Sequence, residues 1–557
     1  MTSAEVSPIT IAAWERHAGR SLEPVELRRE LAAGTLPEAF HAVAREAGER
    51  RAVSIEGESA TYRELDELAG CVAAWLRSRG VRPGDRVVLC GPNSLPFVTA
   101  YLGILRAGAI AVLAGAELTE RELAHLAGNS EAVAAFAAGD ALGRLKSAGG
   151  PVETFVSLDG QSPPTLEEVA AGPDSSAPVP TGSDEIALVG YTSGTTGTPK
   201  GAALSHANVL ASLRGIAIAW RWSPDDVLLH SLPMSHQHGL AGLGVTLLAG
   251  SQAVIQRGLD PGRLAGAARD EEATVLFSVP AIYERLCGEL RDAALHREQG
   301  ESSVSRSAFA SLRLATSGSA PLPPELWNDA AELIGTEPLE RYGTTESGLD
   351  VSNPIDGPRT PGAVGIPLPG VEMEVVDASG AVVPTGADGE VVVRGPQVLG
   401  GYWEQPTATR DAFLPGGWFR TGDLGRIDAN DGYLSITGRL KELIISGGLN
   451  VYPREVELVL EQHPGVGRAA VVGVPSVRWG EAVVAFVVSE GASLDAAEVR
   501  EHARELLAPY KMPKAVIETD TLPIDGFGKL RRGELLRMAA EIDLPGSFAE
   551  GRPPGDR

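Results

Sequence analysis

The feature that most constrains the fold is a repeated alternation of amphipathic helical patterns with short apolar runs. Residues 61–80 (TYRELDELAGCVAAWLRSRG) have helical periodicity, and Thr61 followed three residues later by Glu64 matches a capping box. The apolar runs at 84–93 (GDRVVLCGPN) and 109–115 (AIAVLAG) are typical of buried strands. This alternation favours an α/β fold with parallel or mixed sheets that carry helices on both faces.

The length of 557 residues exceeds what one ordinary core accommodates, so more than one domain is expected. From about Val371 the pattern changes to short β runs separated by turns, which predicts a small β-rich part. Helical and strand patterns then alternate again towards the C-terminus. We expect a large multi-subdomain α/β domain over 1–440, a mobile α+β C-terminal lid over 441–545 and a disordered tail over 546–557.

The charge composition excludes some classes of partner. Acidic residues number 73 and basic residues 48, which gives a formal net charge of −25. Such a surplus excludes a generally cationic surface for nucleic acid or anionic lipid. Only six of the basic residues are lysine, and a lysine retained against this arginine bias is a candidate for a role that needs a compact ammonium. The six are Lys146, Lys200, Lys441, Lys511, Lys514 and Lys529.

The cysteines and the apolar segments bear on the compartment. Cys71, Cys90 and Cys287 lie far apart, so neither a disulfide framework nor a cysteine-rich zinc site is expected, and a reducing compartment, the cytoplasm, is predicted. The N-terminal residues lack the pattern of a signal peptide. The most membrane-like segment, 96–115, is interrupted by Arg106 and several glycines, which favours a buried helix leading into a strand.

A hydroxyl- and glycine-rich segment, YTSGTTGTPKG at 191–201, follows an apolar run. Hydroxyls and backbone N–H groups suit a polyphosphate, glycines permit close approach and a lysine adds charge, so a phosphate-binding loop is favoured over a surface turn. Pro199 and Gly201 depart from GxxxxGK[ST], and GxGxxG is also absent from the segment, which disfavours P-loop kinases and dinucleotide binders. The predicted phosphate-loop residues are Thr192, Ser193, Gly194, Thr195, Thr196, Gly197 and Lys200.

This loop resembles the nucleotide-phosphate loop of the acyl-adenylate-forming enzymes, and the resemblance extends over roughly 61–537. SGSAPL at 317–322 is similar to the adenine-contacting turn of that family, and ERYGTTESG at 340–348 is similar to its YGxTE element. The resemblance implies ATP, Mg²⁺ and coenzyme A as cofactors. It also implies nucleotide contacts from Gly318, Ser319, Ala320, Pro321, Tyr342, Gly343, Thr344 and Thr345.

The same resemblance implies individual roles. Tyr342 would stack on adenine, Thr345 would contact the α-phosphate and Glu346 would hold Mg²⁺, since a hard carboxylate suits a hard cation. Further positions match family elements downstream. They are Asp423 and Arg439 for the ribose hydroxyls, Lys441 for the hinge, Gly447 and Gly448 for the coenzyme A channel (a simple turn being the alternative), and Lys529 for the catalytic lysine that acts with Lys200, Thr345, Glu346 and His236.

LPMSHQHGL at 232–240 matches the element that contributes to the acyl pocket of the family, so His236 and Gln237 are predicted to contact the acid, together with Thr344. A zinc pair formed by His236 and His238 is the alternative. Zinc sites use three or more protein ligands, and the sequence offers no third one nearby. A packed or gating His236 is therefore favoured.

The acid itself is the least constrained feature. Residues 340–371 are closely similar to those of malonyl-CoA synthetases, in which an arginine at the Arg285 position binds the distal carboxylate. Arginine also occurs there in relatives that use uncharged acids. Gln237 and Thr344 depart from the residues usual in malonate enzymes. We predict an acid–CoA ligase for malonate or a related short dicarboxylic acid. The alternatives are a ligase for a fatty or aryl acid, a ligase that loads a separate carrier protein, and a non-catalytic nucleotide-binding protein.

Overall fold

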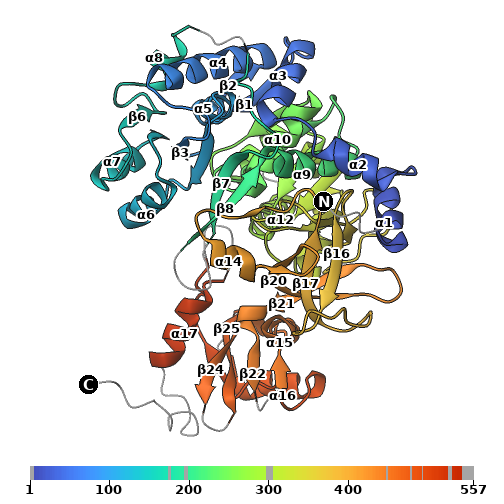
Figure 1. The fold of residues 1–557 in the computed structure, drawn as a ribbon. Coiled ribbons are helices and arrows are strands. Elements are labelled where there is room, and N and C mark those ends of the chain that lie inside the picture. The colour runs from blue at the N-terminus through green and yellow to red at the C-terminus, as the bar shows by residue number, and fades with distance from the viewer. Residues whose placement is uncertain are drawn as a thin grey trace. The chain divides into compact units, whose positions relative to one another are not determined.

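The computed structural model in Figure 1 describes residues 6–173, 177–192, 199–295, 305–446, 449–476, 479–491, 494–524 and 530–541. It is an α/β fold, as predicted. The chain divides into two compact units. Unit 1 comprises Met1–Glu374, Val392–Arg420 and Gly432–Leu434, and unit 2 comprises Val375–Val391, Thr421–Asp431 and Ser435–Arg557. The predicted limits of the large domain and the lid stay a prediction.

Unit 1 contains a seven-stranded sheet in the order β18-β8-β7-β4-β3-β5-β6. Its strands β3 to β7 are parallel, whereas β8 and β18 pair antiparallel at one edge. The strands are β3 (Arg86–Cys90), β4 (Ile110–Ala114), β5 (Ala134–Ala137), β6 (Thr154–Ser157), β7 (Ile186–Thr192), β8 (Lys200–Ser205) and β18 (Gly401–Tyr402). The helices near them are α4 (Tyr62–Ser78), α5 (Leu95–Arg106), α6 (Glu120–Ser130), α7 (Asp140–Ser147) and α8 (Leu166–Ala170).

Local sequence explains why α4 and α5 begin and pack where they do. Thr61 accepts a hydrogen bond from the Glu64 N–H (3.2 Å), and the Glu64 carboxylate accepts one from the Thr61 N–H (2.8 Å), which confirms the predicted capping box. A Cβ at Gly103 would lie 2.4 Å from the Val72 side chain, so only glycine permits this approach of α5 to α4. The membrane-like segment is thus α5 followed by β4, and among the described helices none is long and apolar enough to cross a membrane.

A nine-stranded sheet forms the second layer of unit 1, in the order β15-β14-β13-β12-β11-β9-β10-β1-β2. Its strands are β1 (Arg51–Ile55), β2 (Glu58–Thr61), β9 (Val227–His230), β10 (Gln252–Ile255), β11 (Val275–Ser278), β12 (Leu314–Ser317), β13 (Pro338–Tyr342), β14 (Val351–Ser352) and β15 (Ile366–Pro367). The remaining helices of this part are α1 (Pro8–Ala18), α2 (Pro24–Leu31), α3 (Leu36–Glu46), α9 (His206–Ala219), α10 (Gln237–Ala249), α11 (Pro261–Asp270), α12 (Pro280–Leu295), the 3₁₀ helix η2 (Arg306–Phe309) and α13 (Pro324–Ile334).

The predicted β-rich part is also observed. Five strands pair in the order β16-β17-β20-β19, with β21 beside β20, and they contribute residues to both units. These strands are β16 (Glu372–Val376), β17 (Gly389–Arg394), β19 (Phe413–Leu414), β20 (Trp418–Ile427) and β21 (Leu434–Arg439), with α14 (Pro406–Asp411) between β18 and β19.

Unit 2 is organised around the long hairpin of β24 and β25. Val471 and Val483 face a core shared with α15 and α16, whereas Val472 and Val484 face a second core shared with α17, as the two-residue period of a strand requires. The elements are the 3₁₀ helix η3 (Leu440–Glu442), β22 (Ile444–Ser446), β23 (Leu449–Val451), α15 (Pro453–Leu460), β24 (Val466–Ser476), β25 (Gly480–Ser489), α16 (Ala496–Leu506), β26 (Ala515–Glu518) and α17 (Arg532–Glu541).

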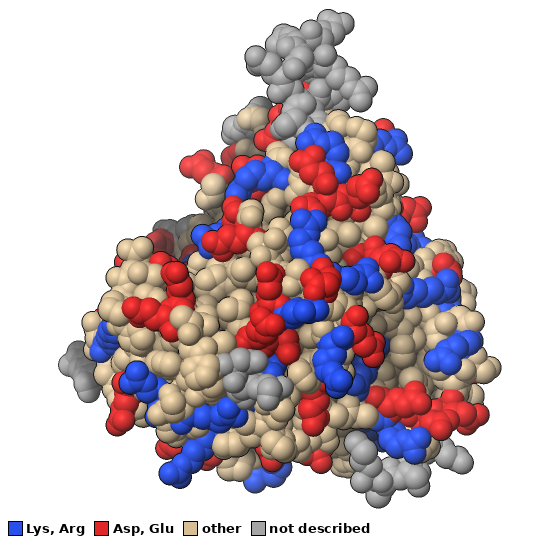
Figure 2. Space-filling model, turned by 90° about the horizontal axis from the view of Figure 1, so that it is seen from above, with Lys and Arg blue, Asp and Glu red and all other residues tan. Residues whose placement is uncertain are grey.

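The charged side chains and the cysteines are placed as follows. On the face shown in Figure 2, acidic and basic side chains are interspersed. All three cysteines are buried free thiols, in agreement with the expected lack of a disulfide framework.

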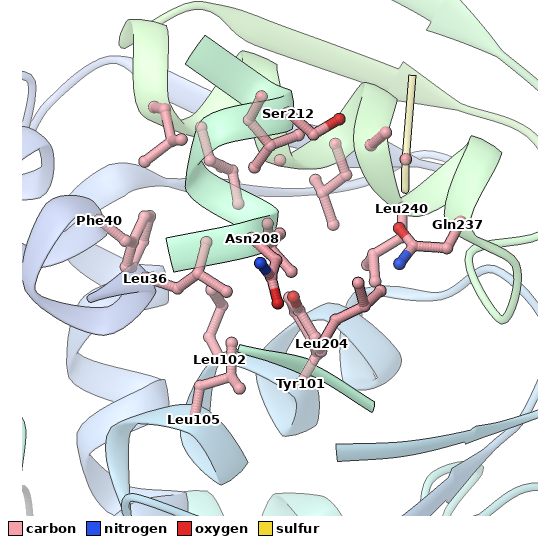
Figure 3. Close-up of a pocket in the computed structure, with 18 of the residues that line it drawn as sticks. Leu36, Phe40, Tyr101, Leu102, Leu105, Leu204, Asn208, Ser212, Gln237 and Leu240 are labelled. Atoms are coloured by element: carbon pink, nitrogen blue, oxygen red, sulfur yellow. The ribbon is translucent and has the colours of Figure 1, made fainter. Parts of the chain in front are cut away.

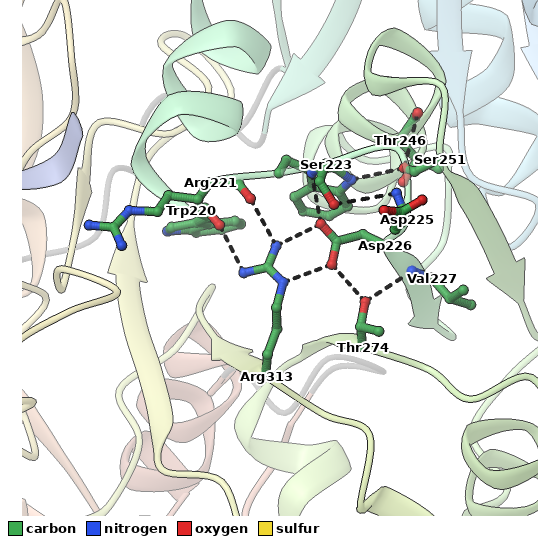
Figure 4. Close-up of polar contacts among 11 residues, drawn as sticks. Trp220, Arg221, Ser223, Asp225, Asp226, Val227, Thr246, Ser251, Thr274 and Arg313 are labelled. Atoms are coloured by element: carbon green, nitrogen blue, oxygen red, sulfur yellow. Dashed lines mark hydrogen bonds and ion pairs between the residues drawn. The ribbon is translucent and has the colours of Figure 1, made fainter. Parts of the chain in front are cut away.

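An ion pair fixes the amino ends of the parallel strands in the nine-stranded sheet (Figure 4). Asp226, which precedes β9 and is 3% exposed, accepts two hydrogen bonds from Arg313, each 2.7 Å long. Thr274, ahead of β11, donates to the same carboxylate at 2.7 Å, and Arg313 also donates to the Trp220 carbonyl at the end of α9 at 2.9 Å. Burial alone would raise the Asp226 pKa, but these hydrogen bonds lower it overall.

We expect Asp226→Asn to reduce the free energy of unfolding by about 3 kcal/mol, because it leaves the Arg313 guanidinium without its charge partner. Asp270→Asn is the control, since the Arg269–Asp270 pair has both side chains more than half exposed and should contribute less than about 0.5 kcal/mol. Urea denaturation of the full chain measures both, and equal losses in the two variants would contradict the assignment.

Candidate active site

The candidate site lies at the carboxyl ends of adjacent parallel strands. In the nine-stranded sheet β9 is flanked by β10 on one side and β11 on the other, so successive connections leave in opposite directions there. Ligands of open α/β sheets bind outside the carboxyl ends of strands at such a switch point. Three predicted elements lie at the carboxyl ends of these strands. The segment 232–240 follows β9, the segment 317–322 begins at the last residue of β12, and the segment 340–348 begins in the second half of β13. The fold therefore brings them to one edge of the sheet.

The second sheet contributes the start of the predicted phosphate loop. Thr192 ends β7 and pairs with Lys200, the first residue of β8. The Thr192 hydroxyl donates to the Glu346 carboxylate at 3.4 Å. The Tyr402 hydroxyl, on the neighbouring β18, donates to the same oxygen at 3.1 Å, and the Lys200 ammonium lies 5.3 Å from the centre of the Tyr402 ring. An ammonium, two hydroxyls and a carboxylate are therefore gathered in one place.

Glycines permit the close approaches that build this cluster. A Cβ at Gly190, in β7, would lie 3.0 Å from the Thr345 methyl group, so the glycine lets the segment carrying Thr345 lie against the strand. A Cβ at Gly343 would lie 2.0 Å from the Gly348 carbonyl oxygen, which no side chain tolerates. The turn from Gly343 to Gly348 is closed tightly, and this turn holds Glu346 towards β7.

A buried polar network supports the same turn. The Thr344 and Ser347 hydroxyls are hydrogen bonded at 2.9 Å, and Ser347 donates to the Asp350 carboxyl group, which also accepts from Gln397 at 3.0 Å. Burial raises the pKa of Asp350 to about 7, the two hydrogen bonds oppose this shift, and the Glu346 charge adds to it.

The turn at 317–322 is fixed by one strained residue. Ser319 has a φ of +68°, which is uncommon for a residue other than glycine, and its hydroxyl is hydrogen bonded to His238 Nδ1 at 2.8 Å. Gly318 is buried against the Arg341 guanidinium of β13, and Ala320 and Pro321 are more exposed. Tyr342 is partly buried at the end of β13.

The predicted acid-binding residues differ in exposure. His236 is the exposed N-cap of α10, and a packed or gating role for it stays a prediction. Gln237 is half-buried in the first turn of that helix. Arg285 is exposed on α12. Within the described parts of the chain, no group of three or more metal-ligating side chains is present, so the zinc alternative gains no support.

An apolar cavity of about 50 Å³ lies between α3, α5, α9 and α10 (Figure 3). Leucines dominate its wall, and Asn208, Ser212 and Gln237 are among its few polar neighbours. Ser347 and Gly348 also line it, so the cavity adjoins the turn that carries Glu346.

In unit 2, the predicted ribose-binding residues are paired. Arg439 Nε lies 3.0 Å from the Asp423 carboxylate, whose side chain is only 6% exposed. Lys441 lies in η3, within the unit. Ser193, Gly194, Thr195, Thr196, Gly197, Gly447, Gly448 and Lys529 lie outside the described residues, as does the predicted tail.

Comparison with known proteins identifies the family. Residues 40–403 match the model of the AMP-binding enzyme family, and residues 455–529 match that of the AMP-binding enzyme C-terminal domain. A feruloyl-CoA synthase from an Amycolatopsis species is 36% identical over 502 residues, which cover 87% of this chain and 95% of that protein. The mitochondrial malonate–CoA ligase ACSF3 of Mus musculus is 33% identical over 559 residues, which cover 94% of each.

A solved structure agrees with these matches. ATP-bound MatB from Rhodopseudomonas palustris superposes with a TM-score of 0.83 at 36% identity, covering 91% of this chain and 99% of that one. The chain therefore belongs to the AMP-binding enzyme family. It is an acid–CoA ligase of the AMP-forming type, which confirms the predicted class of enzyme.

One residue of the candidate site, Tyr402, is not predicted from the sequence. Tyr402 contacts Glu346 and Lys200. In the sequence it is one aromatic residue in GGYWE, and this segment does not indicate which distant residues it contacts.

The Asp350 carboxyl group makes stability depend on pH. With a folded pKa of about 7 against roughly 4 in the unfolded chain, the folded state retains a proton that the unfolded state has lost between these values. The Asp350 carboxyl group therefore stabilises the folded state fully below the unfolded pKa of roughly 4, and this stabilisation is lost as the pH rises through the folded pKa of about 7. Between pH 5 and 8, Asp350→Asn should become more stable relative to the wild type by about 3 kcal/mol.

Urea denaturation at pH 5, 6, 7 and 8 measures this difference. Glu340, whose pKa burial also raises to about 7, is present in both proteins and cancels in the comparison. Asp411→Asn, at a carboxylate 66% exposed, is the control and should follow the wild type at every pH. Parallel curves for Asp350→Asn and the wild type would disprove the assignment.

Proposed function

We propose that this ligase uses ATP, Mg²⁺ and coenzyme A to convert malonate, or a related short dicarboxylic acid, into its CoA thioester in the cytoplasm. The single observation that carries the nucleotide part is the contact of Thr192 and Tyr402 with Glu346 beside the Lys200 ammonium. This arrangement offers hydroxyls and a cation to phosphates and a hard carboxylate to a divalent ion. Likeness to a malonate–CoA ligase over 94% of each chain supports the choice of acid.

The residues fit a magnesium ion that is shared with the nucleotide. Mg²⁺ is commonly held by one or two carboxylates together with substrate phosphates, so Glu346 alone is a sufficient protein ligand. Bound there, the ion would neutralise phosphate charge. Thr345, placed against β7 by Gly190, would donate its hydroxyl to the α-phosphate, and Lys200 would bind the outer phosphates.

The chemistry needs orientation rather than a protein nucleophile. The substrate carboxylate attacks the α-phosphorus of ATP, an acyl-adenylate forms and pyrophosphate leaves. The coenzyme A thiolate then attacks the acyl carbon and AMP leaves. We assign Lys529 to orienting the carboxylate, Asp423 and Arg439 to the ribose, Lys441 to the hinge, and Gly447 and Gly448 to the coenzyme A channel.

A ligase for an acid with an apolar chain is the second candidate. The observation that favours it is the apolar cavity beside Gln237 and Ser347, which suits an alkyl or aryl group. A feruloyl-CoA synthase among the relatives agrees with it. A ligase that loads a carrier protein shares the same first step and differs in the thiol that accepts the acyl group.

Glu346→Gln should lower pyrophosphate release by on the order of 100-fold, because the amide keeps the acceptor for Tyr402 but loses the negative charge for the metal ion. The exposed Glu404, two residues after Tyr402, provides the control Glu404→Gln, which should retain activity. Titrating Mg²⁺ at fixed ATP is the sharper measurement. If Glu346→Gln has the wild-type Mg²⁺ dependence, Glu346 is not the metal ligand.

The acid is tested by offering malonate, methylmalonate, acetate, octanoate and ferulate with ATP, Mg²⁺ and coenzyme A. We expect the malonate thioester to form with the highest kcat/KM, detected by mass spectrometry of the product. Preferential formation of the octanoyl or feruloyl thioester would instead establish the second candidate. A carrier-protein ligase would release pyrophosphate with malonate while forming no CoA thioester.

A further inference from the structure

The chain that leads into β18 contacts both the main chain and the side chain of Glu346. The Leu399 N–H donates to the Glu346 carbonyl oxygen at 2.8 Å. The Gln397 amide donates to the Asp350 carboxyl group, shortly after the same turn, at 3.0 Å. The Tyr402 hydroxyl, at the end of β18, donates to the Glu346 carboxylate at 3.1 Å. One segment that is distant in the sequence therefore positions Glu346 through several hydrogen bonds.

Tyr402 is itself fixed on both sides of β18. It is aligned with Ala202 of β8, and the N–H of the next residue, Trp403, donates to the Gly201 carbonyl at 2.7 Å. The Tyr402 N–H donates to the Thr409 hydroxyl of α14 at 2.9 Å. The backbone is thus anchored to β8 on one side and to α14 on the other, so the phenol starts from a fixed position.

The hydroxyls that contact Glu346 bind the same carboxylate oxygen. Tyr402 and Thr192 each donate to Oε1, at 3.1 and 3.4 Å respectively, so the Tyr402 bond is the shorter one. Among the residues that the structure describes, no hydrogen bond to Glu346 Oε2 is present. A hydrogen bond to one oxygen of a ligating carboxylate fixes the orientation of the other. Oε2 is therefore the oxygen available to an ion.

We propose that Tyr402 is a positioning residue for the magnesium ion, because its hydroxyl holds Glu346 by Oε1 and leaves Oε2 to the ion that ATP brings. Orienting the carboxylate before the ion arrives reduces the conformational freedom that is lost on binding. Tyr402 acts through Glu346 and not on the reacting atoms. This inference rests on the proposed function, since it concerns how the metal ligand assigned there is oriented.

The ring and the hydroxyl of Tyr402 make separate contacts, which lets an experiment distinguish three roles. The Lys200 ammonium lies 5.3 Å from the centre of the ring, and Tyr402→Phe keeps this contact while it removes the hydroxyl. A Tyr402 that serves only the packing of β18 would leave nucleotide and metal binding unchanged in Tyr402→Phe. A hydroxyl that contacts ATP directly would weaken ATP binding with and without Mg²⁺. A positioning hydroxyl affects only the part of ATP binding that depends on Mg²⁺.

The test measures ATP binding to the full chain by isothermal titration calorimetry, once with Mg²⁺ and once in EDTA. We expect Tyr402→Phe to weaken binding with Mg²⁺ by on the order of 10-fold and to leave binding in EDTA within about 2-fold of the wild type. The Mg²⁺ concentration that gives half-maximal pyrophosphate release should rise by a similar factor, while the rate at saturating Mg²⁺ recovers. Tyr433→Phe is the matched control, since it removes a hydroxyl that donates to the Pro358 carbonyl at 2.9 Å, and it should match the wild type in both media.

A double variant tests whether Tyr402 acts through Glu346. Adding Tyr402→Phe to Glu346→Gln should cause no further loss of Mg²⁺ dependence, whereas independent losses would contradict the inference. Thermal melting establishes that each variant folds. Equal weakening of ATP binding in Mg²⁺ and in EDTA would show that the hydroxyl serves the nucleotide and not the ion.

The failure of this inference is distinguishable from the failure of the proposed function. If Tyr402→Phe keeps the wild-type Mg²⁺ dependence while Glu346→Gln loses it, Glu346 is the metal ligand and Tyr402 does not position it. If Glu346→Gln itself keeps the wild-type Mg²⁺ dependence, the assignment of the metal ligand is wrong, and the role of Tyr402 is rejected with it.

Discussion

The parallel pairing of β9, β11, β12 and β13 is the constraint on which the site depends. Parallel strands end at a common edge, so the segments that follow them must meet there however far apart they lie in the sequence. The Asp226–Arg313 pair ties the opposite ends of three of these strands to α9. Because the amino ends are fixed, the carboxyl ends present Gly318, Tyr342 and the turn carrying Glu346 in a defined arrangement.

The fold must also bind anionic substrates although the chain itself is acidic. The chain carries a net charge of −25, yet ATP, coenzyme A and a dicarboxylate are anions, so attraction has to be local. Lys200 lies over the Tyr402 ring beside Glu346. Charges placed in a water-poor site act more strongly than the same charges on the surface. An acidic exterior and a selective anion site are therefore compatible.

The site presents an apolar environment beside its polar turn. Leucine is the residue type that occurs most often in the wall of the cavity beside Gln237 and Ser347. An apolar group would gain free energy by entering this cavity. Relatives named for ferulate and for malonate show that this family accommodates acids of both kinds.

The sequence by itself determined the local structure and the class of chemistry. The capping box at Thr61 is decided by neighbouring residues, and the eleven residues at 191–201, which include Lys200, predict phosphate binding from hydroxyls, glycines and a lysine. Only the tertiary structure decided which distant side chains meet. Tyr402 reaches Glu346 because β18 pairs with β8. Pairing and burial are properties of the assembled sheet, and no local pattern encodes them.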